Sequence, residues 1–114
     1  MSDCLFCGII DGKIKANVVY QDDSVVAFKD IAPKAPVHIL IIPRKHLVSV
    51  ADICEQDRTL VGQIFRVAAK LARDQGVADS GFRIVVNSGP DAGQSVFHLH
   101  YHLLGGRRMS WPPG

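Results

Sequence analysis

The stretch HLHYHLL at residues 98–104 alternates histidine with apolar residues near the end of the 114-residue chain. This alternation is typical of a β-strand, because successive side chains along a strand point to opposite faces of the sheet. We therefore expect a strand over 98–104, with its imidazoles on one face and Leu99, Tyr101 and Leu103 in the core. Neighbouring imidazoles would then lie about 7 Å apart along the strand.

Three readings suit this row of histidines. A half-exposed strand whose polar face happens to be histidine is one, but histidine is a poor strand former. A metal cluster is the second, since neutral imidazole is a common zinc ligand. In the third, an imidazole attacks phosphorus and forms a covalent intermediate, which divides a difficult displacement into two easier steps. The Gly-, Asp- and Ser-containing loop 87–95 favours the third reading, because glycines and turn amides can hold an anionic phosphate.

The rest of the chain predicts an α+β fold with one long and one short helix. Apolar residues at three- and four-residue spacing predict a helix over 57–75, and residues 5–10 form a short apolar turn or helix. β-Branched and aromatic runs predict four further strands, at 18–20, 25–28, 37–42 and 82–86. The run 37–42 barely alternates and is expected to be buried on both faces. Five strands around one long helix indicate an antiparallel sheet, and the length indicates a single domain over 1–114.

Composition excludes several classes of protein. Hydrophobic residues make up 47% and charged residues 21%, which excludes intrinsic disorder. A formal net charge of +2 is too weak to indicate a nucleic-acid partner. No apolar run approaches the roughly 20 residues of a membrane span, and no secretory signal is visible. We therefore expect a cytoplasmic protein without a membrane partner, in which the three cysteines do not form a disulfide framework.

Residues 98–104 resemble the His-φ-His-φ-His-φ-φ signature (φ, apolar) of the histidine triad (HIT) superfamily. Gly93-Gln94-Ser95 and the C-terminal WPPG at 111–114 resemble its Hint branch, the purine nucleoside phosphoramidases. The similarity extends from about residue 5 to the last residue. It implies the HIT fold and a homodimer in which two five-stranded sheets join into one of ten strands. It also implies hydrolysis of nucleoside 5′-phosphoramidates, with AMP or GMP and an amine as products.

The same resemblance implies roles for individual residues. His100 would be the nucleophile, and the reaction would pass through a nucleotidyl-histidine intermediate. His102 would hold the α-phosphate together with backbone amides near Gly93 and Gln94. Ser95 would hydrogen-bond the phosphate or the leaving nitrogen.

Other residues would bind the nucleoside or support the nucleophile. His38 would support His100, and Asn87 would sit beside the phosphate group. Asp30 would accept hydrogen bonds from the ribose hydroxyls, and Trp111 would reach toward the partner's active site. Six apolar side chains would line the purine pocket, although without the resemblance most of them read as core: Leu5, Phe6, Ile9, Ile14, Phe28 and Ile31.

A Cys-x-x-Cys pair near the N-terminus indicates a possible metal site. A redox motif would normally open a helix after a strand, which is not the context here. Zinc needs four ligands, and some HIT proteins bind structural zinc through two N-terminal cysteines and two histidines. The resemblance implies the set Cys4, Cys7, His46 and His98 in this chain. Zinc bound there would be structural and would leave His100 unliganded, so that catalysis requires no metal.

Two alternatives to the phosphoramidase remain. One is a dinucleoside polyphosphate hydrolase of the Fhit type, a branch that shares the triad but not this C-terminal tail. The other is a zinc-dependent nucleotide-binding adaptor, in which the same site binds a nucleotide without turnover.

Overall fold

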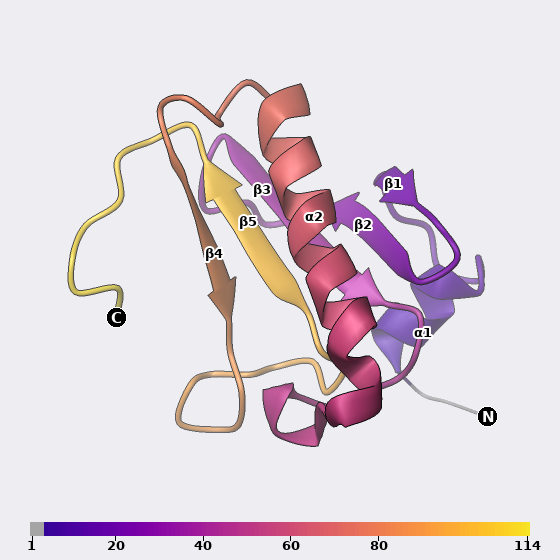
Figure 1. Ribbon diagram of the computed structural model, residues 1–114. Coiled ribbons are helices and arrows are strands. Elements are labelled where there is room, and N and C mark those ends of the chain that lie inside the picture. The colour runs from indigo at the N-terminus through magenta and orange to yellow at the C-terminus, as the bar shows by residue number, and fades with distance from the viewer. Residues whose placement is uncertain (1–3) are drawn as a thin grey trace.

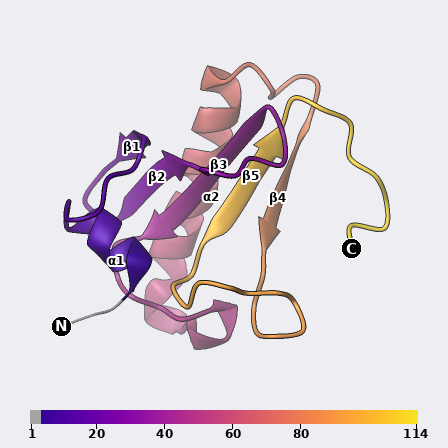
Figure 2. The same ribbon diagram turned by 180° about the vertical axis from the view of Figure 1, so that it is seen from behind.

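The computed structural model describes residues 4–114, which form one five-stranded antiparallel sheet with helices on both faces (Figures 1 and 2). The strand order is β1-β2-β3-β5-β4, so β1 and β4 are the edges. The elements are α1 (Leu5–Ile10), β1 (Val18–Gln21), β2 (Val25–Lys29), β3 (Val37–Pro43), two 3-10 turns (Val50–Asp52 and Glu55–Asp57), α2 (Arg58–Asp74), β4 (Phe82–Val86) and β5 (Tyr101–Gly105). This architecture confirms the predicted α+β fold.

The two helices cover opposite faces of the sheet (Figures 1 and 2). Helix α2 buries one side, with Ile64, Val67 and Leu71 in the larger core. Helix α1 is short, and its N-cap is Cys4, whose Sγ accepts a hydrogen bond from the Cys7 N–H. Neither of them is long and apolar enough to cross a bilayer.

Strand β3 is the central strand, and both of its faces are buried, as its barely alternating run predicts. Ile39 and Ile41 lie in the core beneath α2. Leu40 and Ile42 lie in a second, smaller core beneath α1. The sheet therefore separates two apolar layers, and the α1 layer is the one that meets the histidines.

The strand expected over 98–104 begins only at Tyr101, so its predicted start is wrong. Regular pairing with β3 stops at the Ile41–Tyr101 pair. Upstream of it, the Leu99 N–H donates to the Leu47 carbonyl, which lies beyond the end of β3. Proline ends regular pairing there because Pro43 has no N–H to donate.

The side chains nevertheless alternate as expected. Leu99, Tyr101 and Leu103 lie in the core beneath α2. The rings of His98 and His100 lie against Phe6 of α1, on the opposite face. The two faces of this segment are therefore predicted correctly, although its first residues are not in a strand.

Replacing Gly105 by alanine is expected to destabilise the fold by about 1–3 kcal/mol through overpacking. A Cβ at Gly105, in β5, would lie 2.9 Å from both Cβ and Cγ2 of Val77, a buried core residue. Gly62 in α2 offers the matched control, since a Cβ there meets nothing within 4 Å. Gly62→Ala should instead stabilise the protein by about 0.5–1 kcal/mol, because alanine favours a helix interior. Urea denaturation of both variants checks the opposite signs, and equal shifts would contradict the packing argument.

Candidate active site

A cavity of about 280 Å³ opens on the α1 face of the sheet. Its walls come from α1, β2, the segment that follows β2, and the histidine segment. All six apolar residues expected around a purine line it: Leu5, Phe6, Ile9, Ile14, Phe28 and Ile31. Its polar groups include Asp30, Ser95, His100 and His102. The cavity thus joins a long apolar wall to a small group of hydrogen-bonding side chains, as ligand sites commonly do.

Four residues expected near the substrate do not line this cavity, namely Asn87, Gly93, Gln94 and Trp111. Five lining residues were not anticipated from the sequence: Lys15, Ala16, Lys29, Leu40 and Val96. Four of them lie next to an expected residue or to one another along the chain, whereas Leu40 in β3 carries no such signal.

Gln94 shapes the loop beside the cavity. Its side-chain Nε2 donates to the carbonyls of Val48 and Val96, at 2.6 and 3.1 Å. Its Oε1 accepts from the Gly89 N–H at 2.9 Å. The buried amide therefore joins the two ends of the loop to a neighbouring segment, and so positions Ser95 at the cavity wall.

The nucleophile expected from the sequence is held in one tautomer. His100 Nδ1 lies 2.7 Å from the His98 carbonyl, which can only accept, so Nδ1 carries the proton. The lone pair of the neutral ring is consequently on Nε2. The residue is 5% exposed, yet its ring lines the cavity and lies edge-on to Phe6, with centroids 5.1 Å apart. This geometry gives His100 the tautomer that a nucleophile needs.

A second hydrogen-bonded chain fixes the next imidazole. The Lys34 N–H donates to His38 Nδ1 at 3.0 Å, so the neutral His38 ring carries its proton on Nε2. This Nε2 lies 2.9 Å from His102 Nδ1 and 3.4 Å from Asp30 Oδ2. His102 therefore accepts at Nδ1 and keeps an Nε2–H to offer an anion. His38 reaches His100 only through His102, whose ring centroid lies 5.1 Å from that of His100.

The hydrogen bonds of His38 also indicate whether this part of the site suits a metal ion. Asp30, His38 and His102 place their ligand atoms within 4.8 Å of one another. The His38 nitrogen that faces the other two carries a proton, because its other nitrogen accepts from the backbone. These three residues therefore form a proton-ordered hydrogen-bond chain, which favours acid–base chemistry over metal binding at this point.

Burial keeps the imidazoles of His38 and His102 neutral at physiological pH. Burial, followed by the neighbouring His100 and His38, lowers the pKa of His102 to about 4, against an opposing effect of Asp30. Burial likewise lowers the pKa of His38, and the Asp30 carboxylate partly offsets this. At neutral pH both rings therefore hold the tautomers that the hydrogen bonds dictate.

The low pKa of His102 predicts that stability falls as the pH drops from 6.5 to about 4. In this window the unfolded chain binds a proton that the folded chain excludes, so acid favours unfolding. At about 1.4 kcal/mol per pH unit, and reduced because solvent screens part of the ring, the shift corresponds to on the order of 1–3 kcal/mol. Urea denaturation across the window measures the loss. His102→Gln, which cannot titrate, should reduce the slope to the part that His38 contributes, whereas an unchanged slope would contradict the assignment.

A second polar cluster lies where α1 begins. The Sγ atoms of Cys4 and Cys7 and the Nδ1 atoms of His46 and His98 all lie within 4.8 Å of one another. Individual separations are 3.4 Å from Cys4 Sγ to His98 Nδ1 and 3.3 Å from Cys7 Sγ to His46 Nδ1. A tetrahedral zinc ion with ordinary bond lengths places such atoms about 3.3–3.8 Å apart. The cluster could therefore bind a metal ion with little rearrangement.

His98 is oriented for this role by its other ring nitrogen. Nε2 lies 2.8 Å from the Pro43 carbonyl, so it carries the proton and donates. The lone pair is then on Nδ1, which faces the two thiols and His46. Metal-binding histidines commonly make such a hydrogen bond with the nitrogen that does not bind the metal. The first histidine of the triad thus belongs to this cluster, and its ring lines none of the cavity.

Comparison with known proteins agrees with this geometry. The HIT domain family model matches residues 11–109. An uncharacterized HIT-like protein of Synechocystis is 48% identical over 112 residues, covering 98% of this chain and 97% of the relative. A solved HIT family hydrolase from Legionella pneumophila is also 48% identical, with a TM-score of 0.97 over 98% of this chain and 100% of that chain.

A more distant structure shares the same fold. The histidine triad nucleotide-binding protein of Candida albicans is 30% identical, with a TM-score of 0.82 over 96% of this chain and 83% of its own. The family model covers all five strands of the sheet and the whole histidine segment. On this evidence, the chain belongs to the HIT family.

Proposed function

We propose that this chain hydrolyses purine nucleoside 5′-phosphoramidates in the cavity beside α1. The observation that carries the proposal is the hydrogen bond from His100 Nδ1 to the His98 carbonyl, at 2.7 Å. It leaves the Nε2 lone pair on a ring that lines a cavity with an apolar wall. The similarity to a histidine triad nucleotide-binding protein and to HIT family hydrolases supports a nucleotide substrate.

The residues around the cavity suit the parts of such a substrate. The purine lies among the apolar side chains, and Asp30 accepts hydrogen bonds from the ribose hydroxyls. His100 Nε2 attacks the α-phosphorus, a P–N bond forms to the ring, and the P–N bond to the amine breaks as the amine takes up a proton from solvent. The neutral His102 offers its Nε2–H to a phosphate oxygen, and Ser95 hydrogen-bonds the phosphate or the leaving nitrogen. Water then cleaves the nucleotidyl-histidine, which releases the nucleoside monophosphate and restores His100.

Mass spectrometry of protein quenched during turnover tests this mechanism directly. We expect a nucleotidyl adduct on His100 with an adenosine phosphoramidate as substrate. Comparing turnover with that on a diadenosine polyphosphate separates the phosphoramidase from the Fhit-type alternative. Binding of AMP without any turnover or adduct would favour the adaptor alternative and contradict the hydrolase.

The ribose contact gives a sharper test of how the substrate lies. Asp30→Asn and a 2′-deoxy substrate should each lower kcat/KM by roughly tenfold or more, as expected for a hydrogen bond to a charged group. Both changes remove the same contact, so together they should cost little more than either alone. Multiplicative losses would show that Asp30 acts elsewhere, for example on His38.

Cys4, Cys7, His46 and His98 are proposed to hold a structural zinc ion. The donor set of two thiols and two imidazoles, with His98 already oriented by the Pro43 carbonyl, fits zinc. Bound zinc would join α1 to the segments that carry the two histidines, and would take no part in the reaction. His100 is not one of the four candidate ligands, and its hydrogen bond to His98 goes to the backbone carbonyl rather than to the ring.

A homodimer is also proposed, formed through the β4 edge. This strand has an unpaired edge, and exposed edges favour pairing with another strand.

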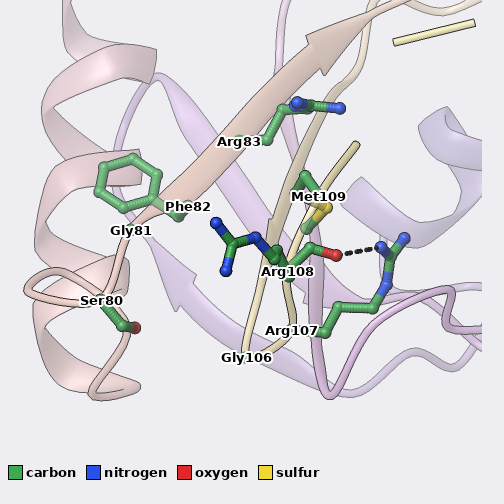
Figure 3. A pocket seen from close by; sticks show the side chains of 8 residues that line it. All are labelled: Ser80, Gly81, Phe82, Arg83, Gly106, Arg107, Arg108 and Met109. Carbon is green, nitrogen blue, oxygen red and sulfur yellow. Dashed lines mark hydrogen bonds between the residues drawn. The ribbon is translucent and has the colours of Figure 1, made fainter. Parts of the chain in front are cut away.

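Beside β4 lies an open groove of about 660 Å³, between the start of β4 and the start of the C-terminal segment, shown in Figure 3. Arg83 and Arg107 bordering the groove donate to the carbonyls of Ser110 and Lys34. Trp111, 82% exposed, remains available to a partner, and sedimentation analysis tests the oligomeric state.

A further inference from the structure

Helix α1 belongs to the metal cluster and to the nucleotide cavity at the same time. Its N-cap Cys4 and its Cys7 supply two of the four ligand atoms of the cluster. Leu5, Phe6 and Ile9 of the same helix line the cavity. Isolated helices shorter than about 12 residues are only marginally stable in water. The position of this six-residue helix therefore depends on its tertiary contacts.

Aromatic contacts that hold α1 lie close to the site. The ring of Phe6 lies edge-on to Phe28 at 5.4 Å, to His98 at 6.0 Å and to His100 at 5.1 Å between centroids. The Cys4 thiol of the N-cap lies 3.4 Å from His98 Nδ1, and the Cys7 thiol lies 3.3 Å from His46 Nδ1. Since a thiol S–H is only a weak hydrogen-bond donor, the cluster holds the helix less firmly without a metal than with one.

A second connection runs through the backbone of His98. Its ring offers Nδ1 to the cluster, and its carbonyl accepts the Nδ1–H of His100. Fixing the His98 ring therefore also fixes the carbonyl that sets the tautomer of the nucleophile. Phe6 and His100 contact each other at the cavity, and each depends on the cluster. Phe6 belongs to α1, which carries Cys7, and His100 is held by the His98 carbonyl.

We propose that metal binding in the cluster and nucleotide binding in the cavity are thermodynamically coupled through α1 and His98. Metal bound by the cluster holds these elements in the arrangement that the nucleotide requires, and so raises nucleotide affinity. His46 is then a positioning residue for the nucleotide, although it lies outside the cavity. The inference rests on the proposed nucleotide site and adds to it a metal-dependent affinity.

Linkage makes this proposal quantitative. If zinc raises the affinity for AMP by a given factor, AMP must raise the affinity for zinc by the same factor. Couplings between distinct sites in proteins are commonly about 5- to 150-fold. We therefore expect chelation to weaken AMP binding by at least about fivefold, and saturating AMP to strengthen zinc binding equally.

Calorimetry with AMP, on zinc-loaded and chelator-treated protein, measures the first factor. Competition with a coloured zinc chelator, with and without AMP, measures the second. His46→Ala should weaken AMP binding as chelation does, although His46 does not line the cavity. His46→Cys keeps a zinc ligand at this position and should restore AMP affinity in the presence of zinc. Cys54→Ser removes a thiol outside the cluster and is the matched control, for which both affinities should be unchanged.

Hydrogen exchange distinguishes local coupling from general unfolding. Chelation should lower amide protection in α1 and around 98–100, while the amides of α2 stay protected. Loss of protection in α2 as well would overturn the proposal, because the effect would then be global. AMP that binds equally tightly with and without zinc would overturn the coupling and leave the proposed function intact. AMP that does not bind zinc-loaded protein at all would overturn both.

Discussion

His100→Ala is expected to lower turnover of an adenosine 5′-phosphoramidate by a factor on the order of 10⁶, as loss of a nucleophile does in enzymes with covalent intermediates. The variant lacks the nitrogen that attacks phosphorus, and neither neighbouring histidine can replace it. His98 uses its nitrogens on the Pro43 carbonyl and the metal cluster. His102 accepts from His38 at Nδ1 and carries its proton on Nε2.

Single-turnover kinetics measures this loss, and AMP affinity measured alongside it shows whether the cavity is intact. Affinity should change only a few-fold, because most of the cavity wall is apolar and remains in place. His102→Gln is the informative companion, since it keeps the nucleophile and should still form the adduct, only more slowly. Hydrolysis by His100→Ala at the rate of the parent would exclude the proposed mechanism.

Removal of zinc is expected to lower the melting temperature by about 10 °C or more. The folded chain brings four ligand atoms together, whereas the unfolded chain does not, so bound zinc stabilises the folded state alone. A structural Cys₂His₂ site can supply several kcal/mol, and each kcal/mol shifts the midpoint of a domain near this size by about 4 °C. Calorimetry with and without a chelator measures the shift.

Variants at the cysteines separate the metal effect from chelator artefacts. Cys7→Ser should melt at the temperature of the chelated protein and no longer respond to chelator. Cys54→Ser should behave as the parent, because its thiol contacts Gln56 and Asp57 near the start of α2 and lies outside the cluster. A parent protein that contains no zinc when purified with metal present, and melts unchanged with chelator, would exclude the structural site.

Local periodicity predicted most of this fold. The barely alternating run of β3 and the alternation of 98–104 each reflect a burial pattern that the sheet imposes directly on the sequence. The start of β5 could not be predicted this way. It is set outside this segment, because Pro43 has no N–H to donate and the Leu99 N–H pairs instead with the distant Leu47 carbonyl. No feature within 98–104 encodes either residue.

The site was less accessible to sequence reasoning than the fold. Apolar residues that line a cavity and apolar residues that fill a core show the same spacing, so Leu5 and Ile14 could be placed only through the resemblance to the HIT family. The hydrogen bonds that assign each tautomer involve carbonyl and amide groups of Lys34, Pro43 and His98. Backbone groups are common to every residue and leave no trace in a sequence.

The position of His98 changes how a mutational scan of the three triad histidines should be interpreted. Its ring is 0% exposed and borders no part of the cavity, yet the residue orients its neighbour through a carbonyl that every amino acid possesses. An alanine there would keep the carbonyl but lose the side chain that anchors it. Such a scan would rank His98 beside His100 as indispensable, even though only His100 lines the cavity.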